Sequence, residues 1–120
     1  MAWKNYNRPN KYNNHKTIVD GIKFDSIREA ERYQELKLLE EAGKISYLEL
    51  QPVVVLQDKF IYQGRMFRAI TYRADFACFD RTVNRGVIED VKGMETDVFK
   101  IKKKMFLKKY GDLYDLRITR

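Results

Sequence analysis

Cysteine, histidine and proline are scarce in this chain of 120 residues, which contains one Cys, one His and two Pro. The single cysteine, Cys78, cannot form an internal disulfide and leaves no second thiol for a cysteine-rich zinc site. We interpret it as a small buried apolar side chain, and we do not expect the lone His15 to bind a metal. The composition therefore argues against a disulfide scaffold and a Cys/His zinc domain.

Long apolar runs are also missing, since none approaches the roughly 18 residues that a membrane span needs. The first residues, MAWKNYNRPNKYNNHK, lack the apolar stretch of a signal peptide. We therefore expect a cytoplasmic protein without membrane contact. The length is common for one domain, and residues 1–15 show no apolar period. We predict a flexible basic arm over 1–15 and a single domain over 16–120.

The formal net charge of +7 is unevenly distributed. Residues 1–19 carry four Lys/Arg and no acid, residues 20–90 carry eleven against thirteen acids, and residues 91–120 carry nine against four. A positive surface attracts a polyanion, and nucleic acid is the commonest such partner. The basic ends thus favour DNA binding, while the acidic middle contains residues that could hold a metal.

Helical and extended patterns alternate along the chain. Asp20-Gly21 is typical of a hairpin turn, and Ser26-Ile27-Arg28-Glu29 is a capping-box sequence that begins a helix. Helices are predicted over 26–42 and 97–110, each followed by a glycine that ends it. Strands are predicted over 17–19, 22–24, 45–50, 53–56, 60–62, 66–79, 87–91 and 113–119. This order indicates an α/β fold, with a mixed central sheet flanked by helices and an N-terminal β-hairpin.

Two acids and a lysine stand out in the predicted strands. Residues two apart in a strand point the same way, so Asp90 and Lys92 should share one face. Asp75 lies within the predicted strand 66–79 among apolar residues. A buried carboxylate needs an ion pair, hydrogen bonds or a bound cation to compensate for lost hydration.

Magnesium suits such a site because it prefers oxygen ligands and is often held by only one or two carboxylates. Asp75, Asp90 and the backbone carbonyl of Val91 could supply these oxygens, with Mn²⁺ as an alternative ion. The metal would stabilise charge on a scissile phosphate and activate a water molecule. Lys92 could orient that water or stabilise the transition state as a compact cation.

A known sequence motif fits these residues. The run Ala74-Asp75-Phe76, followed by Glu89-Asp90-Val91-Lys92-Gly93, resembles the PD-(D/E)xK motif of the restriction-endonuclease-like superfamily. That superfamily often places an acid on its first core helix, a position that Glu29 fits. Alanine replaces the motif's proline before Asp75, which removes shape but no ligand. Because its side chain should point away from Lys92, Glu89 is not the expected motif acid.

The resemblance extends along most of the chain to a family of small phage-encoded proteins that are considered similar to Holliday-junction resolvases. The matching positions are Asn10-Lys11-Tyr12, Asp20-Gly21-Ile22, residues 26–29, Gln51, Asp75-Phe76, Val91-Lys92-Gly93, Phe99, Lys102 and Lys104. It implies a restriction-endonuclease-like core and a Mg²⁺-dependent endonuclease for branched DNA in phage recombination or packaging. It also implies metal or catalytic roles for Glu29, Asp75, Asp90 and Lys92, and a location in the host cytoplasm. Symmetric cutting of two strands favours a homodimer.

Simpler roles remain open for each of these residues. Glu29 could be only a capping partner, Asp90 and Lys92 a simple ion pair, and Asp75 a partner of Arg73 or another cation. Lys102 falls within the apolar stripe of helix 97–110, so it either snorkels to water or contacts a phosphate. The residues predicted to contact DNA are Lys102, Lys103, Lys104 and Lys108, with Lys11 and Lys16 near the arm.

Three functions follow from these alternatives. The first is an endonuclease selective for branched DNA. The second is a sequence-specific or single-stranded DNA nuclease with the same centre. The third is a DNA-binding module whose acids are only structural.

Overall fold

Residues 16–120, the part of the chain that the computed structural model describes, form a mixed α/β fold with two helices and ten strands. The elements are β1 (Thr17–Val19), β2 (Ile22–Phe24), α1 (Ile27–Glu41), β3 (Ile45–Leu50), β4 (Val53–Gln57), β5 (Phe60–Tyr62), β6 (Arg65–Phe67), β7 (Ile70–Arg73), β8 (Phe76–Asp80), β9 (Arg85–Val91), α2 (Asp97–Tyr110) and β10 (Tyr114–Thr119). The predicted α/β class and the N-terminal hairpin are confirmed. The arm predicted over 1–15 lies outside the described residues.

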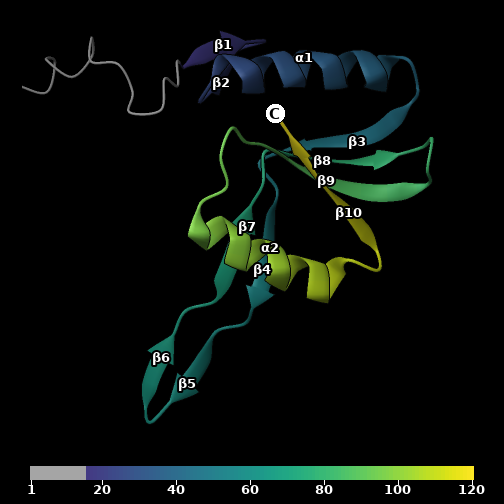
Figure 1. Ribbon diagram of the computed structural model, residues 1–120. Helices are drawn as coiled ribbons and strands as arrows, with labels where there is room; N and C mark the ends of the chain where they lie inside the picture. Colours follow the sequence, from purple (N-terminus) through teal and green to yellow (C-terminus); the bar gives the residue numbers. More distant parts are fainter. Residues whose placement is uncertain (1–15) are drawn as a thin grey trace, which may run out of the picture.

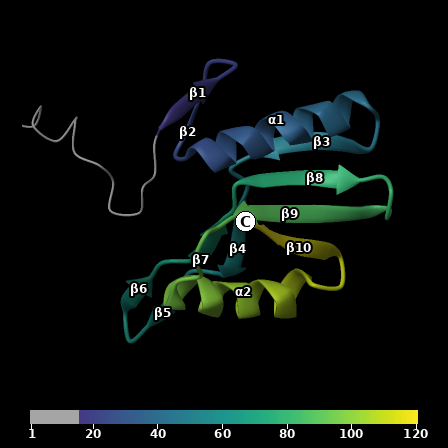
Figure 2. The same cartoon turned by 45° about the horizontal axis from the view of Figure 1, so that its top comes forward.

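The central sheet has four strands in the order β10-β9-β8-β3. The pair β9 and β10, which are joined through α2, is parallel, whereas β8 is antiparallel to both β9 and β3. Figure 1 shows α1 and α2 on opposite sides of this sheet, and Figure 2 shows the same layers from another angle. Each helix therefore covers one face of the sheet.

Strand alternation gives each face its own apolar core. On the α1 face the buried residues are Phe24, Ala30, Tyr33, Leu36, Ile45 and Phe76. On the α2 face they are Leu56, Tyr72, Ala74, Ile88, Phe99 and Phe106. Because neighbours in a strand face opposite ways, β9 presents Glu89 to one layer and Asp90 to the other.

The predicted strand 66–79 is wrong as a single element, because it is divided among β6, β7 and β8. The second break falls at Ala74-Asp75, where the chain leaves β4 and joins the central sheet: the Ala74 N–H donates to the Pro52 carbonyl, and the Asp75 N–H to the Glu89 carbonyl. Seven strands, rather than the five predicted ranges, thus lie between the helices. Asp75 stands at a strand junction and not in mid-strand.

Both helix starts are capped as predicted. Ser26 accepts from the backbone N–H of Glu29, and Thr96 accepts from that of Phe99, each at 3.1 Å. The apolar stripes are narrower than predicted, since four of their members are more than half exposed: Ile27, Leu38, Val98 and Ile101. The buried face of α2 is consequently formed mainly by Phe99 and Phe106.

Candidate metal-binding site

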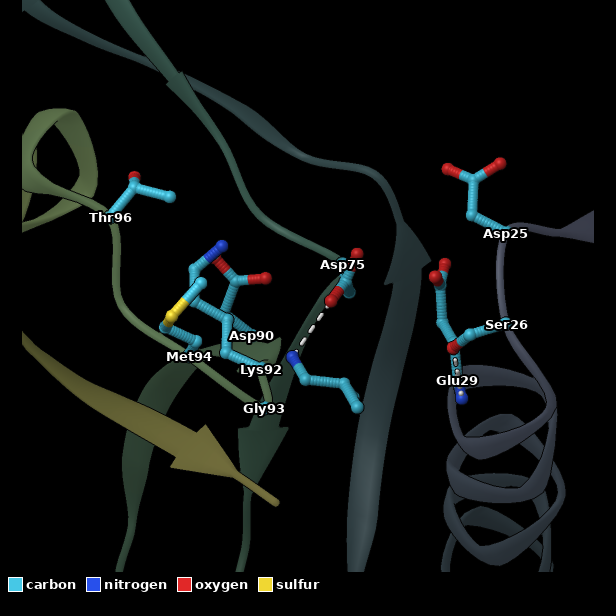
Figure 3. A pocket seen from close by; sticks show the side chains of 10 residues that line it. Asp25, Ser26, Glu29, Asp75, Asp90, Lys92, Gly93, Met94 and Thr96 are labelled. Carbon is cyan, nitrogen blue, oxygen red and sulfur yellow. Dashed lines mark hydrogen bonds and ion pairs between the residues drawn. The ribbon is translucent and has the colours of Figure 1, made fainter. Parts of the chain in front are cut away.

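A cavity of about 480 Å³ opens where the start of α1, the β7–β8 junction, the end of β9 and the loop before α2 meet. It is lined by Asp25, Ser26, Glu29, Asp75, Asp90, Val91, Lys92, Gly93, Met94 and Thr96. Figure 3 shows Asp75 between Asp90 and Lys92 on one side and Glu29 on the other. The four residues predicted to be catalytic therefore line one cavity.

The backbone around Asp75 fixes its carboxylate. The residue follows β7 and directly precedes β8, and its own N–H donates to the Glu89 carbonyl on β9. The Asp75 carboxylate accepts from the Val91 N–H at 2.7 Å. The end of β9 therefore holds this side chain toward the cavity (Figure 3).

Asp90 is only 3% exposed, and both Tyr72 and Lys92 contact its carboxylate. The Tyr72 hydroxyl donates to its carboxylate at 2.6 Å, and the Lys92 ammonium lies 3.4 Å from the same oxygen. Lys92 also lies over the Phe99 ring, 4.4 Å from the centroid. The predicted side-by-side placement of Asp90 and Lys92 is confirmed, and Tyr72 is a contact that the sequence reasoning missed.

The electrostatics of the cavity disfavour three separate anions. Burial is the main reason that the pKa of Asp75 lies well above its usual range, followed by a hydrogen bond to Asp90 and the negative charges of Asp90 and Glu29. Burial also raises the pKa of Glu29, with Asp25 and Asp90 adding to the effect. Burial and the hydrogen bond to Asp90 raise the pKa of Tyr72. Such a cluster favours uptake of a proton or a cation.

Magnesium fits the acids of this cavity only in part. Among residues 16–120, no group of three or more acidic, histidine or cysteine side chains is arranged to hold a metal ion. Asp75 and Asp90 provide the one or two carboxylates that Mg²⁺ commonly uses, and Val91 adjoins them in the cavity lining. Glu29 lines the same cavity without completing a three-carboxylate group, so its role as a ligand stays a prediction.

The start of α1 contributes Glu29 and Asp25 to the cavity. Glu29 is 8% exposed, and its carboxylate accepts a hydrogen bond from the backbone of Asp25. In a capping box the acid would instead accept from the backbone of the N-cap residue, Ser26, which is one residue later. Asp25 is exposed and immediately precedes the N-cap residue Ser26. The sequence did not single it out, because it belongs neither to the capping box nor to the strand motif. Its only signal is its place next to Ser26.

Glu89 faces the opposite side of the sheet. Its carboxylate pairs with both the Nε and the Nη2 of Arg32 on α1 and accepts from the Thr119 hydroxyl at 2.9 Å. These contacts confirm that Glu89 points away from Lys92. Asp90 is therefore the acid that shares a face with the lysine.

The predicted DNA-binding lysines within residues 16–120 are not part of the cavity lining. Lys102 is half-buried on α2, Lys103 pairs with Glu95 at 3.3 Å, and Lys104 and Lys108 are exposed. Lys16 is exposed just before β1, and Lys11 falls outside the described residues. A role in DNA binding stays a prediction for all of them.

The fold and cavity define a mixed α/β protein in which Asp90 and Lys92, at the end of the central strand β9, face Asp75, which lies just before β8. The family described as "protein of unknown function (DUF1064)" matches residues 9–120, and the chain belongs to this family. No curated protein and no solved structure matches the chain. Within residues 16–120, neither helix is long and apolar enough to cross a membrane.

Proposed function

We propose that this protein is a metal-dependent endodeoxyribonuclease with a restriction-endonuclease-like core. The observation that carries the proposal is the meeting of Asp75, Asp90 and Lys92 in one cavity. The resemblance of these residues to the PD-(D/E)xK motif supports it. The high pKa of Asp75 adds a physical reason, because a divalent cation would relieve the repulsion between the two carboxylates.

Each side chain has a task in this proposal. Asp75 and Asp90 would hold Mg²⁺ or Mn²⁺, with the Val91 carbonyl as a further oxygen and Glu29 on the far wall. When bound, the metal supplies charge stabilisation for a phosphate and lowers the pKa of a coordinated water. Lys92 would place a compact positive charge beside the reacting phosphate. Tyr72 would orient Asp90 through its hydrogen bond.

Branched DNA is the substrate that we favour. The resemblance to a family of small phage-encoded proteins that are considered similar to Holliday-junction resolvases motivates this choice, and the net charge of +7 suits a polyanion. Cutting two strands symmetrically would require a homodimer. Linear duplex and single-stranded DNA are the competing substrates.

A DNA-binding module without catalysis is the second candidate. Asp90 already has a hydrogen bond from Tyr72 and an ion pair with Lys92, so it is satisfied without a metal. In this case the acids would serve the fold, and DNA would be bound but never cut.

Cleavage of a labelled four-way junction in Mg²⁺ separates these functions, with linear duplex and single strands in parallel. We expect cutting of the junction by the wild type and by Asp112→Asn, a control that removes an exposed acid outside the cavity, and none by Asp75→Asn. Equal cutting of all three DNAs would favour a less selective nuclease. Binding without cutting would support the non-catalytic module.

A further inference from the structure

A two-stranded ribbon formed by residues 53–73 projects from the body of the protein (Figure 1). Its base is the antiparallel pair β4 and β7, and its outer part is the antiparallel pair β5 and β6, which we call the tip hairpin. The base packs against α2 through Leu56 and Tyr72. All the buried residues of the ribbon lie in its base, and the tip hairpin has none.

The tip hairpin exposes large apolar side chains. The exposed fractions are 45% for Phe60, 69% for Ile61, 61% for Tyr62 and 53% for Met66. The register places Phe60 and Tyr62 on one face of the hairpin and Ile61 and Met66 on the other, so both faces expose apolar surface to water. Clustered exposed apolar side chains often mark a binding site. The hairpin therefore has the character of a binding element rather than of a simple connection.

One face of this hairpin combines aromatic rings with an arginine. The register places Phe60 opposite Phe67 and Tyr62 opposite Arg65, so that all four side chains share a face. The two Phe rings are stacked with centroids 5.1 Å apart, and the Arg65 guanidinium lies 5.2 Å from the Phe67 centroid. Rings and guanidinium planes of this kind are the groups on which nucleic-acid bases stack.

The ribbon is also locally basic. Residues 58–73 contain one acid, Asp58, and four exposed cations, which are Lys59, Arg65, Arg68 and Arg73. None of these cations forms an ion pair with another residue in the range 16–120. Their positive charge is thus available to an anionic partner.

We propose that the tip hairpin is a DNA-binding arm, in which Tyr62 and Phe60 stack on bases while Arg65 and its neighbouring cations contact phosphates. This inference rests on the proposed endonuclease function and identifies the element that binds its DNA substrate. A two-stranded ribbon fits the major groove of a duplex, and branch points expose base faces that aromatic rings can cover. The charge of the ribbon favours DNA over a protein partner.

The base of the ribbon connects the tip hairpin to the candidate metal site. Tyr72 in β7 donates to Asp90, and Asp75 lies two residues after the end of β7. From Arg73 to the turn at Gly64 the chain spans nine residues, or at most about 30 Å of extended strand. One turn of B-DNA has a similar length of about 34 Å. The tip hairpin would therefore contact DNA up to about one helical turn from the cut.

A double variant tests the arm with a matched control. Tyr62→Ala with Arg65→Ala removes one ring and one guanidinium from the tip hairpin. Tyr47→Ala with Arg81→Ala removes the same groups from exposed positions on the body. Binding of each protein to a fluorescent four-way junction is measured by anisotropy in EDTA, so that the readout does not depend on cleavage.

We expect the tip variant to bind at least about fivefold more weakly, since one stacked base contributes about 1–3 kcal/mol, and the control to bind like the wild type. Equal binding by the tip variant would overturn the inference, whether or not the protein cuts DNA. Weaker binding by a protein that never cuts would uphold the arm and reject the endonuclease.

Further measurements test whether the variants unfold and whether the tip hairpin binds a second copy of the chain instead of DNA. Thermal unfolding of both double variants shows whether the body is intact, and Arg65→Lys keeps the charge but loses the planar stacking group, so we expect it to lie between wild type and the double variant. Sedimentation without DNA tests the rival occupant, a second copy of the chain. A wild-type dimer that the tip variant loses, with unchanged DNA affinity, would identify the hairpin as a self-association surface and refute the inference.

Discussion

Two neighbouring acids on β9, Glu89 and Asp90, are each 3% exposed, yet they lie in very different surroundings. On the α1 face, Glu89 meets the forked guanidinium of Arg32 and the hydroxyl of Thr119. On the α2 face, Asp90 meets a phenol, a half-buried lysine and a second carboxylate, Asp75. Arg32 matches the charge of Glu89, and we call this the closed site although Glu89 also lines a cavity of about 240 Å³. Asp90 shares a larger cavity of about 480 Å³ with further carboxylates, and we call this the open site.

The difference separates a structural ion pair from a candidate reactive site. A bidentate pair with Arg leaves little reason for Glu89 to bind anything else. If both carboxyl groups on the other face were ionised, they would carry more negative charge than Lys92 alone can balance. Burial, followed by the neighbouring Asp90, therefore keeps the pKa of Asp75 high. Burial alone would not distinguish these acids, but their partners do.

The largest effect that we expect comes from changing the acid in the open site. Asp90→Asn should abolish cleavage because it removes a metal ligand, while an amide oxygen can still accept from Tyr72 and preserve the fold. Glu89→Gln is the matched change on the closed side. We expect it to retain cleavage, although with lower stability. Single-turnover cleavage and urea unfolding of both variants check this contrast, and an active Asp90→Asn would reject the metal site.

The free energy of unfolding should depend more on Glu89 than on Asp90, the opposite of what we expect for cleavage. Glu89→Ala removes the better buried of the two acids that pair with Arg32, since the other, Glu35, is 47% exposed. Breaking a buried pair costs up to about 3–5 kcal/mol. Asp90→Asn should cost far less. The free energy of unfolding from urea titration measures both, and a small loss for Glu89→Ala would show that the ion pair does not hold α1 to the sheet.

Lys92 gives a smaller but more specific effect. If it stabilises charge in the transition state, Lys92→Ala should slow turnover by on the order of a hundredfold, with little change in DNA binding. Lys92→Arg should be nearly as slow, because its planar fork changes the geometry. As a simple ion-pair partner of the buried Asp90, the lysine would instead serve stability, and its loss would lower the free energy of unfolding without slowing cleavage. Near-normal cleavage by Lys92→Ala would therefore favour the ion-pair role.

The sequence predicted the parts of the site that depend on local periodicity. Alternation along a strand placed Asp90 and Lys92 together and sent Glu89 to the other side, and the capping pattern placed Glu29 at the start of α1. Tyr72 could not be found this way. It reaches Asp90 because β7 belongs to a separate ribbon, a tertiary pairing that leaves no period in the sequence.

The ribbon shows why the net charge of a long segment can mislead about which part of it binds DNA. Residues 20–90 carry a small net negative charge, which pointed to the two ends of the chain as the DNA-binding parts. Within this region, four cations lie in the ribbon, while many of the acids lie on α1. The junction at Ala74-Asp75 was missed for a related reason, because the apolar pattern continues through it and only the hydrogen-bond partners change.

The smallest effect that we expect is a pH dependence of stability at the open site. Burial, followed by the hydrogen bond to Asp90, raises the pKa of Asp75 in the folded protein. In the unfolded chain an aspartate titrates near 3.9, so above that pH the folded state holds a proton that the unfolded state has lost. The resulting stabilisation is complete at low pH and is lost as the pH rises through the folded-state value.

The free energy of unfolding in EDTA should therefore fall between about pH 5 and pH 8 in the wild type. The fall should be smaller in Asp75→Asn, which cannot titrate, and unchanged in the exposed control Asp112→Asn. At the higher pH, Mg²⁺ should restore stability by about 1.4 kcal/mol for each tenfold excess over its dissociation constant, because it binds only the folded state. Urea unfolding at both pH values, with and without Mg²⁺, measures these differences. The same slope in Asp75→Asn as in the wild type would assign the pH dependence to other groups, and a lack of response to Mg²⁺ would leave the two carboxylates as a proton-sharing pair.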